Sequence, residues 1–136
     1  MRIAVVSVSA RRNGIPEYVK SLARGMESPG HRVDILDAWT SDGFSLPGYE
    51  YVAVCAEAVS MWGGKMPGAL AKVLGTGNGL VGKKSAAFLK KTSPFFVNRA
   101  LSNLMRAMEK QGMLINWSEI LLNSSHAEAM GKRIGA

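Results

Sequence analysis

The sequence predicts an α/β domain of three layers, in which helices cover both faces of a doubly wound parallel sheet of five strands. Residues 3–6 and 51–56 are continuously apolar, as strands buried on both faces are. Strand patterns alternate with helical patterns along almost the whole chain, which is typical of a parallel sheet. A chain of 136 residues can bury one core but not two, so we expect a single domain over residues 1–136.

The first unit is a buried strand at residues 3–6, a turn of small residues and a helix. Proline is favoured at the first helical position, so we expect the helix to begin near Pro16 and to end before Pro29. The next strand, at residues 31–37, is shorter and more alternating, as an edge strand would be. A loop rich in Ser, Asp, Gly and Pro follows at 38–48.

The later elements continue the alternation. In chain order we expect a strand at 51–56, a loop at 57–64, a helix from 66 or 67 to 74, a glycine-rich segment at 75–82, a strand at 84–89, a helix from Pro94 to Gln111, and a strand within 113–122. Ser125 with Glu128 three residues later predicts that a capping box begins a final, short helix.

These elements fit a sheet whose strands, numbered along the chain, lie in the order 2-1-3-4-5, with right-handed crossovers. In such sheets a ligand binds beyond the carboxyl ends of the strands, where the strand order reverses between strands one and three. We therefore expect the loop after the first strand and the loop at 57–64 to converge on one crevice.

The turn after the first strand has the composition of an anion-binding loop. Hydroxyl, amide and backbone N–H groups stand just before a helix N-terminus, which favours negative charge, at Ser7, Ser9, Asn13 and Gly14. Arg11 is placed to add a charge-assisted contact. The sequence therefore predicts a phosphate-bearing ligand. The alternative from the residues alone is that the serines are small residues at a strand end and that Arg11 is solvated.

Two segments carry a family resemblance. Residues 7–19, SVSARRNGIPEYV, resemble the phosphate loop of the flavodoxin-like NAD(P)H-dependent FMN reductases and related flavoproteins. Residues 60–74, SMWGGKMPGALAKVL, are similar to the second flavin loop of that family, and residues 80–88, LVGKKSAAF, to the stretch that leads into its fourth strand. The resemblance spans nearly the whole chain and implies the flavodoxin-like fold.

The resemblance also implies a cofactor and a site. FMN would be the ligand, with its phosphate held by Ser7, Ser9, Arg11, Asn13 and Gly14, one side of its ring bordered by Met61, Trp62 and Gly63, and the other by the loop that begins with Thr92 and Ser93. The implied function is an oxidoreductase or electron-transfer protein, with NAD(P)H or a redox partner protein at the other end of the electron path. No side chain is assigned a catalytic role, because a bound flavin performs such chemistry itself.

Several residues depart from the family pattern and support an alternative. Val8, Pro16, Glu57 and Met61 stand where the family has turn residues, phosphate-contacting side chains or a stacking aromatic, and Glu57 brings negative charge toward an anion site. The alternative is a flavodoxin-like module that has lost its flavin and acts as a binding or scaffold protein. Its basic surface and the exposed apolar loop residues Phe95 and Phe96 would then serve a partner protein or a second copy in a homodimer.

Charge and cysteine usage exclude several other classes. The net charge of +7 is dispersed in pairs along the chain and no nucleic-acid-binding motif accompanies it, so nucleic acid is an unlikely partner. The single cysteine, Cys55, stands in an apolar strand, so we expect a buried structural thiol and no cysteine-based metal site. No signal-peptide pattern and no apolar run of about 18 residues is present, which favours a cytoplasmic protein without a membrane segment.

Overall fold

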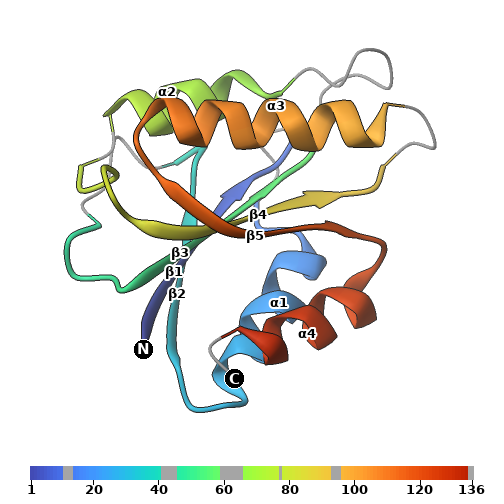
Figure 1. The fold of residues 1–136 in the computed structure, drawn as a ribbon. Coiled ribbons are helices and arrows are strands. Elements are labelled where there is room, and N and C mark those ends of the chain that lie inside the picture. The colour runs from blue at the N-terminus through green and yellow to red at the C-terminus, as the bar shows by residue number, and fades with distance from the viewer. Residues whose placement is uncertain (11–13, 41–45, 59–65, 77, 93–95, 135–136) are drawn as a thin grey trace.

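A computed structural model of the chain describes residues 1–10, 14–40, 46–58, 66–76, 78–92 and 96–134. Within these ranges, parallel strands form one sheet in the order β2-β1-β3-β4-β5, as Figure 1 shows. The strands are β1 (Arg2–Val8), β2 (Arg32–Asp37), β3 (Tyr51–Ala56), β4 (Lys84–Lys90) and β5 (Leu114–Leu121). The predicted strand order and the edge position of the second strand are confirmed.

Helices cover both faces of the sheet, so the predicted three layers are confirmed. The helices are α1 (Glu17–Glu27), α2 (Gly68–Thr76), α3 (Val97–Lys110) and α4 (Ser124–Arg133). In Figure 1, α2 and α3 lie above the sheet, and α1 and α4 lie below it. None of the helices in the described ranges has the length and apolar character needed to cross a membrane.

The central strands β1 and β3 are buried on both faces, which accounts for their continuous apolar sequences. Successive side chains of a strand point to opposite faces, and both faces of β1 and β3 are covered by helices. Ala4 and Val6 pack in the core under α2 and α3, whereas Ile3 and Val5 pack in the core under α1 and α4. Every residue of β3 is buried, while the edge strands β2 and β5 are mostly half-exposed.

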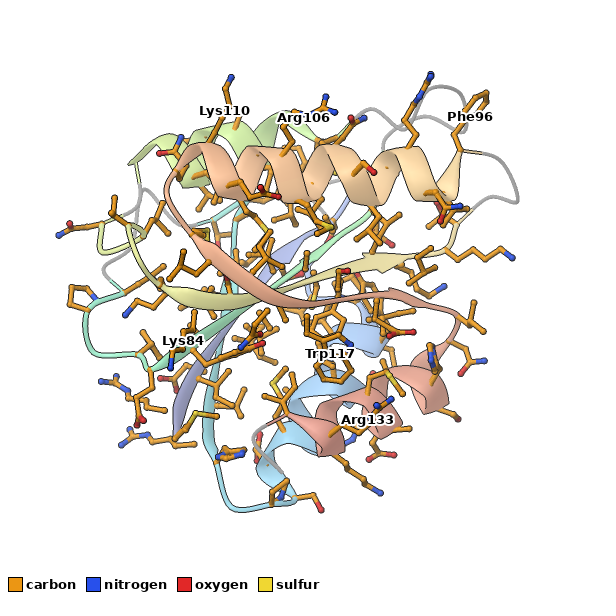
Figure 2. All side chains as sticks on the ribbon, in the orientation of Figure 1. Lys84, Phe96, Arg106, Lys110, Trp117 and Arg133 are labelled. Carbon is orange, nitrogen blue, oxygen red and sulfur yellow. The ribbon has the colours of Figure 1, made fainter. Side chains whose placement is uncertain are left out.

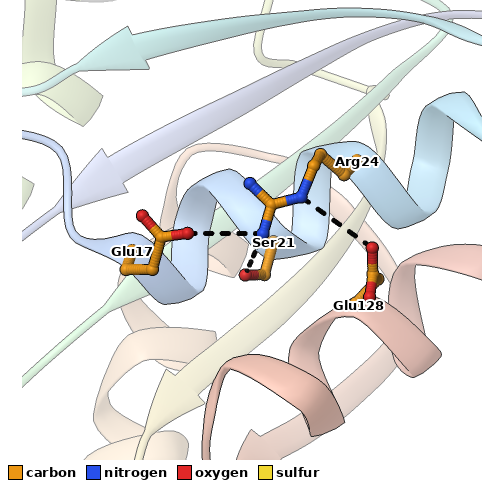
Figure 3. Close-up of polar contacts among 4 residues, drawn as sticks. All are labelled: Glu17, Ser21, Arg24 and Glu128. Atoms are coloured by element: carbon orange, nitrogen blue, oxygen red, sulfur yellow. Dashed lines mark hydrogen bonds and ion pairs between the residues drawn. The ribbon is translucent and has the colours of Figure 1, made fainter.

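Two glycines let α1 and α4 approach closely. A Cβ atom added at Gly25 would lie 2.1 Å from the backbone oxygen of Glu128, and one added at Gly131 would lie 2.3 Å from that of Leu22. Polar contacts tie the same helices together at the surface (Figure 3): the Arg24 guanidinium lies 3.8 Å from Glu128, and it also contacts Glu17 and Ser21 on its own helix. The helix pair therefore depends on the absence of side chains at its crossing.

The start of the final helix differs from the prediction. Asn123, and not Ser125, is the N-cap of α4, and its Oδ1 accepts a hydrogen bond of 2.8 Å from the backbone N–H of His126. The predicted capping box was therefore wrong. Asparagine is as good an N-cap as serine, and here Asn123, two residues before Ser125, satisfies the N–H group of the third helical residue, His126.

Two local irregularities were not predicted. Phe96, the N-cap of α3, has a φ of 57°, in the left-handed region that side chains other than glycine rarely adopt. In β5 the register shifts opposite Ser85 and Ala86, whose partners are Ile115 and Trp117. Asn116 is consequently the extra residue of a β-bulge, and its Oδ1 accepts a hydrogen bond from the hydroxyl of Tyr51, the first residue of β3.

Candidate functional site

The loops that follow β1 and β3 meet at the carboxyl edge of the sheet. The backbone N–H of Glu57 donates to the carbonyl oxygen of Val8 at 3.2 Å, which continues the pairing of the two strands by one step. The backbone N–H of Ala10 donates to Oε1 of Glu57 at 3.0 Å. The described parts of these two loops therefore meet, as expected, at the point where the strand order reverses between β1 and β3.

The hydroxyl groups of the first loop are buried rather than displayed. Ser7 and Ser9 are 0% and 1% exposed. Ser9 Oγ makes a long hydrogen bond of 3.5 Å to the carbonyl oxygen of Gly14, and Ser7 Oγ has no hydrogen-bond partner among the described residues. A buried hydroxyl without a partner is uncommon in a native protein, so Ser7 marks a place where a water molecule or a ligand group would be stabilised.

A tryptophan that the sequence did not point to helps to hold this loop. Nε1 of Trp39 donates to the carbonyl oxygen of Ser9 at 2.8 Å. Trp39 lies two residues beyond the end of β2, and its own backbone N–H donates to the carboxylate of Asp37, the last residue of that strand. Because parallel strands end at the same edge of a sheet, the position of Trp39 after β2 was the signal that could have found it.

Gly14 and the helix start complete the described part of the first loop. Gly14 is exposed and has a φ of +86°, so glycine is required where the chain turns back into α1. The N-cap of α1 is Pro16, which offers no side-chain hydrogen bond, and Glu17 stands in the first turn. The carboxylate of Glu17 offsets part of the positive potential that the helix N-terminus would offer to an anion.

Three side chains lie under the loops on the α1 side of the sheet. Tyr18 and Cys55 are buried, and burial raises the pKa of both groups, with Cys55 and Glu57 adding to the increase for Tyr18. Lys90 lies with its Nζ 6.0 Å from the centre of the Tyr18 ring. Cys55 is therefore a protonated thiol in the core, as its apolar strand suggested.

The remaining predicted site residues divide into two groups. Thr92 is exposed just beyond β4, where Lys91 continues the strand pairing through a hydrogen bond of 2.9 Å to Leu121. Phe96 is 41% exposed, as the partner hypothesis expected. The other predicted residues lie outside the described ranges, and their roles stay predictions: Arg11, Asn13, Met61, Trp62, Gly63, Ser93 and Phe95.

The described residues allow a direct test of whether a flavin phosphate fits. The Ala10 amide is a donor at the expected place, and the unpartnered Ser7 hydroxyl lies in the same strand end. The Glu57 carboxylate, however, already accepts from Ala10, and a carboxylate beside a phosphate would repel it. Among the described residues, the backbone N–H of Ala10 and the hydroxyl of Ser7 therefore suit a phosphate, whereas the half-buried Glu57 carboxylate opposes one.

No protein-family model matches the sequence, and no curated protein sequence matches it. Solved structures do match. Oxidised flavodoxin 1 from Bacillus cereus superposes with a TM-score of 0.70 at 14% identity, covering 99% of this chain and 95% of that chain. An archaeal flavodoxin gives 0.66 at 17% identity, covering 99% and 94%. Two-electron reduced flavodoxin from Megasphaera elsdenii gives 0.64 at 10% identity, covering 96% of each chain. At these identities the likeness shows the flavodoxin-like fold.

Proposed function

We propose that this chain binds FMN at the carboxyl edge of its sheet and acts in electron transfer. The observation that carries the proposal is the meeting of the loops after β1 and β3, where the backbone N–H of Glu57 donates to the carbonyl oxygen of Val8. Structural neighbours that were solved in an oxidised and in a two-electron reduced state support a redox role for this architecture. The family resemblance of residues 7–19 and 60–74 supports FMN as the ligand.

In this proposal the chain supplies position and access, and a bound flavin supplies the capacity to take up and release electrons. The Ala10 amide, Ser9 and Gly14 hold the phosphate, together with Arg11 and Asn13. Met61, Trp62 and Gly63 border one side of the ring, and Thr92 and Ser93 border the other. NAD(P)H, as in the FMN reductases that the sequence resembles, or a redox partner protein provides the electrons.

The hydrogen bond between Ala10 and Glu57 favours a second candidate function. The Glu57 carboxylate occupies the Ala10 N–H, which a phosphate would otherwise use as a hydrogen-bond donor. It also places a second negative charge beside the phosphate, which weakens binding. A chain in which this contact persists would be a flavodoxin-like module without a flavin, acting as a binding or scaffold protein. The two candidates differ in one measurable property, the affinity for FMN.

The test is an absorbance spectrum of freshly purified protein, followed by titration with FMN and with riboflavin. Flavin absorbance, or saturable FMN binding that is tighter than riboflavin binding, would support the FMN proposal. The Arg11→Ala variant should then weaken FMN binding by about 1–3 kcal/mol, because a charge-assisted hydrogen bond is lost. No binding of either flavin at any accessible concentration would leave the flavin-free module as the function.

A further inference from the structure

A pocket lies at the amino ends of the strands, at the opposite end of the sheet from the candidate flavin site. It has a volume of about 480 Å³ and is lined by Met1, Tyr51, Lys84, Asn116, Trp117, Arg133 and Ile134. These residues come from the position before β1, the first positions of β3 and β4, the early part of β5, the end of α4 and the residue that follows it. The volume falls in the range of pockets that hold small organic ligands, which is about 300–1,000 Å³.

The charged side chains that line this pocket in the described part of the chain are basic. Lys84 and Arg133 are both exposed, and no aspartate or glutamate is among the lining residues. Neither cation forms an ion pair with a described carboxylate. Glu119 does not line the pocket, but its Oε2 accepts a hydrogen bond of 3.3 Å from Nε1 of the lining residue Trp117. The two lining cations outnumber this single neighbouring carboxylate, so the local potential is positive and attracts an anion.

Arg133 is held in place by an aromatic ring rather than by a carboxylate. Its Cζ lies 5.3 Å from the centre of the Trp117 ring, and its Nη1 is 3.9 Å from Sδ of Met130. Figure 2 shows Trp117 and Arg133 in the space between β5 and α4. A cation–π contact orients the guanidinium without neutralising it, so its N–H groups remain suited to a carboxylate or phosphate.

The bulge in β5 adds a polar group to the pocket. The Tyr51 hydroxyl donates a hydrogen bond of 2.6 Å to Oδ1 of Asn116. Burial raises the pKa of Tyr51 to about 12, so this hydroxyl stays protonated at neutral pH. Because the contact uses the acceptor of the Asn116 amide, the group that the amide still offers is its pair of N–H donors.

The rest of the lining is apolar or aromatic. Trp117 is half-buried, with its ring in a T-shaped contact with Phe88 at 5.6 Å, and Ile134 is 3% exposed. Rigid aromatic and aliphatic surface of this kind binds the flat, uncharged part of a ligand. The pocket therefore combines an anion-binding side with an apolar side.

We propose that this pocket binds a small organic anion with a flat aromatic body. Lys84 and Arg133 pair with its phosphate or carboxylate, and Asn116 donates to it. Tyr51, Trp117 and Ile134 contact its body. The proposal does not depend on flavin binding, because the pocket and the candidate flavin site lie at opposite ends of the strands.

Adenosine monophosphate is a suitable probe, because it joins a phosphate to a flat base. We expect calorimetric titration of the full chain to show saturable binding of adenosine monophosphate, with at least tenfold weaker binding of both adenosine and inorganic phosphate. Equal affinity for adenosine would overturn the anion-binding part, and equal affinity for inorganic phosphate would overturn the role of the flat body. An absence of adenosine monophosphate binding would overturn the whole proposal.

Matched variants locate the binding. The double variant Lys84→Ala with Arg133→Gln should weaken adenosine monophosphate binding at least tenfold. The control, Arg106→Gln with Lys110→Ala, removes the same two charges from α3, on the other side of the sheet (Figure 2), and should leave the affinity unchanged. An equal loss in both variants would show that only net charge matters and would overturn the site.

A variant of the phosphate loop separates this pocket from the candidate flavin site. Arg11→Ala should leave the affinity for adenosine monophosphate unchanged, because the pocket and the phosphate loop lie at opposite ends of the strands. Weaker binding of adenosine monophosphate by Arg11→Ala would assign the binding to the phosphate loop instead and would overturn the proposal. We also expect adenosine monophosphate to change the tryptophan fluorescence of the chain, and this change should disappear in Trp117→Phe. If the change persists in that variant, the ligand binds elsewhere and the proposal is overturned.

Discussion

In the proposed FMN site, the Glu57 carboxylate is the described side chain that opposes binding of the phosphate. We predict that Glu57→Gln binds FMN about tenfold more tightly than the unchanged chain, a difference of about 1.4 kcal/mol. The glutamine amide can still accept from the Ala10 N–H, which lies 3.0 Å from the carboxylate, but it carries no negative charge to repel the phosphate. Fluorescence titration with FMN measures the difference.

The control for this variant is Glu27→Gln, which removes the same charge at the exposed C-terminal end of α1. Its affinity for FMN should equal that of the unchanged chain. An equal gain in both variants would show that Glu57 acts only through net charge. Riboflavin, which lacks the phosphate, should bind equally to the unchanged chain and to Glu57→Gln.

Cys55 is predicted to be chemically inert in the folded protein. It is fully buried, and burial raises the pKa of its thiol, so almost no thiolate is present at pH 8. Iodoacetamide should therefore label the native chain hardly at all within hours, whereas the chain in urea should be labelled within minutes. Mass spectrometry counts the labelled fraction. Rapid labelling of the native chain at pH 8 would mean that the strand end opens to solvent.

At the residue scale, the sequence predicted that the loops after β1 and β3 meet, but it did not predict the individual contacts between them. Glu57 was predicted to bring negative charge toward the anion loop, and it does lie against Ala10. Its hydrogen bond to that amide, and the contact of Trp39 with Ser9, could not be predicted. Both depend on how loops from different strands are placed, which local propensity does not determine.

The contact between α1 and α4 requires glycine at its centre. We predict that Gly131→Ala lowers the free energy of unfolding by about 1–3 kcal/mol, because the added methyl group would lie 2.3 Å from the backbone oxygen of Leu22 and the helices must separate. The control is Gly75→Ala in α2, where a Cβ atom meets nothing within 4 Å. It should raise stability by up to about 1 kcal/mol, since alanine favours the helix.

Urea unfolding of the three proteins, followed by circular dichroism, measures these changes. If Gly131→Ala were as stable as Gly75→Ala, the close approach of α1 and α4 would be absent in solution. A loss of stability in both variants would indicate instead that the helices do not tolerate alanine for a reason unrelated to their contact.

At the scale of elements, prediction succeeded where a pattern was repeated and failed where one residue decides. The apolar runs of β1 and β3 and the spacing of Leu101, Leu104 and Met108 in α3 extend over several residues, so each pattern is difficult to mistake. The start of α4 depends on one cap, and both Asn123 and Ser125 have suitable side chains. The β-bulge at Asn116 leaves no pattern, because it arises from pairing with β4.

At the scale of the whole molecule, the strand order followed from few observations. Buried strands must be central and a half-exposed strand must be at an edge, and right-handed crossovers then leave few arrangements of five parallel strands. The same argument placed the two ligand loops at one end of the sheet. That argument gave no prediction for the amino ends of the strands, where residues of β5 and α4 line the pocket beside Trp117.

The stability of the whole domain should fall in alkaline solution. Burial raises the pKa values of Tyr18, Tyr51 and Cys55, with Tyr51 reaching about 12, so the folded state favours their protonated forms. A group of this kind stabilises the fold fully at pH values below its unfolded pKa, which is about 8.5 for cysteine and about 10 for tyrosine. Its contribution is lost as the pH rises through the folded pKa, because the unfolded chain releases the proton first. The urea midpoint should therefore be nearly constant from pH 7 to 8 and should fall steadily above about pH 9.

Tyr51→Phe isolates one part of this decline. The variant loses the hydrogen bond to Asn116 at every pH, so its urea midpoint is lower throughout, but it has no hydroxyl to ionise. Its midpoint should consequently fall less steeply than that of the unchanged chain between about pH 10 and pH 12, whereas the two slopes should agree below pH 9. Identical slopes above pH 10 would show that Tyr51 is solvated in the folded state, and the amide of Asn116 would then lack the fixed orientation on which the anion pocket depends.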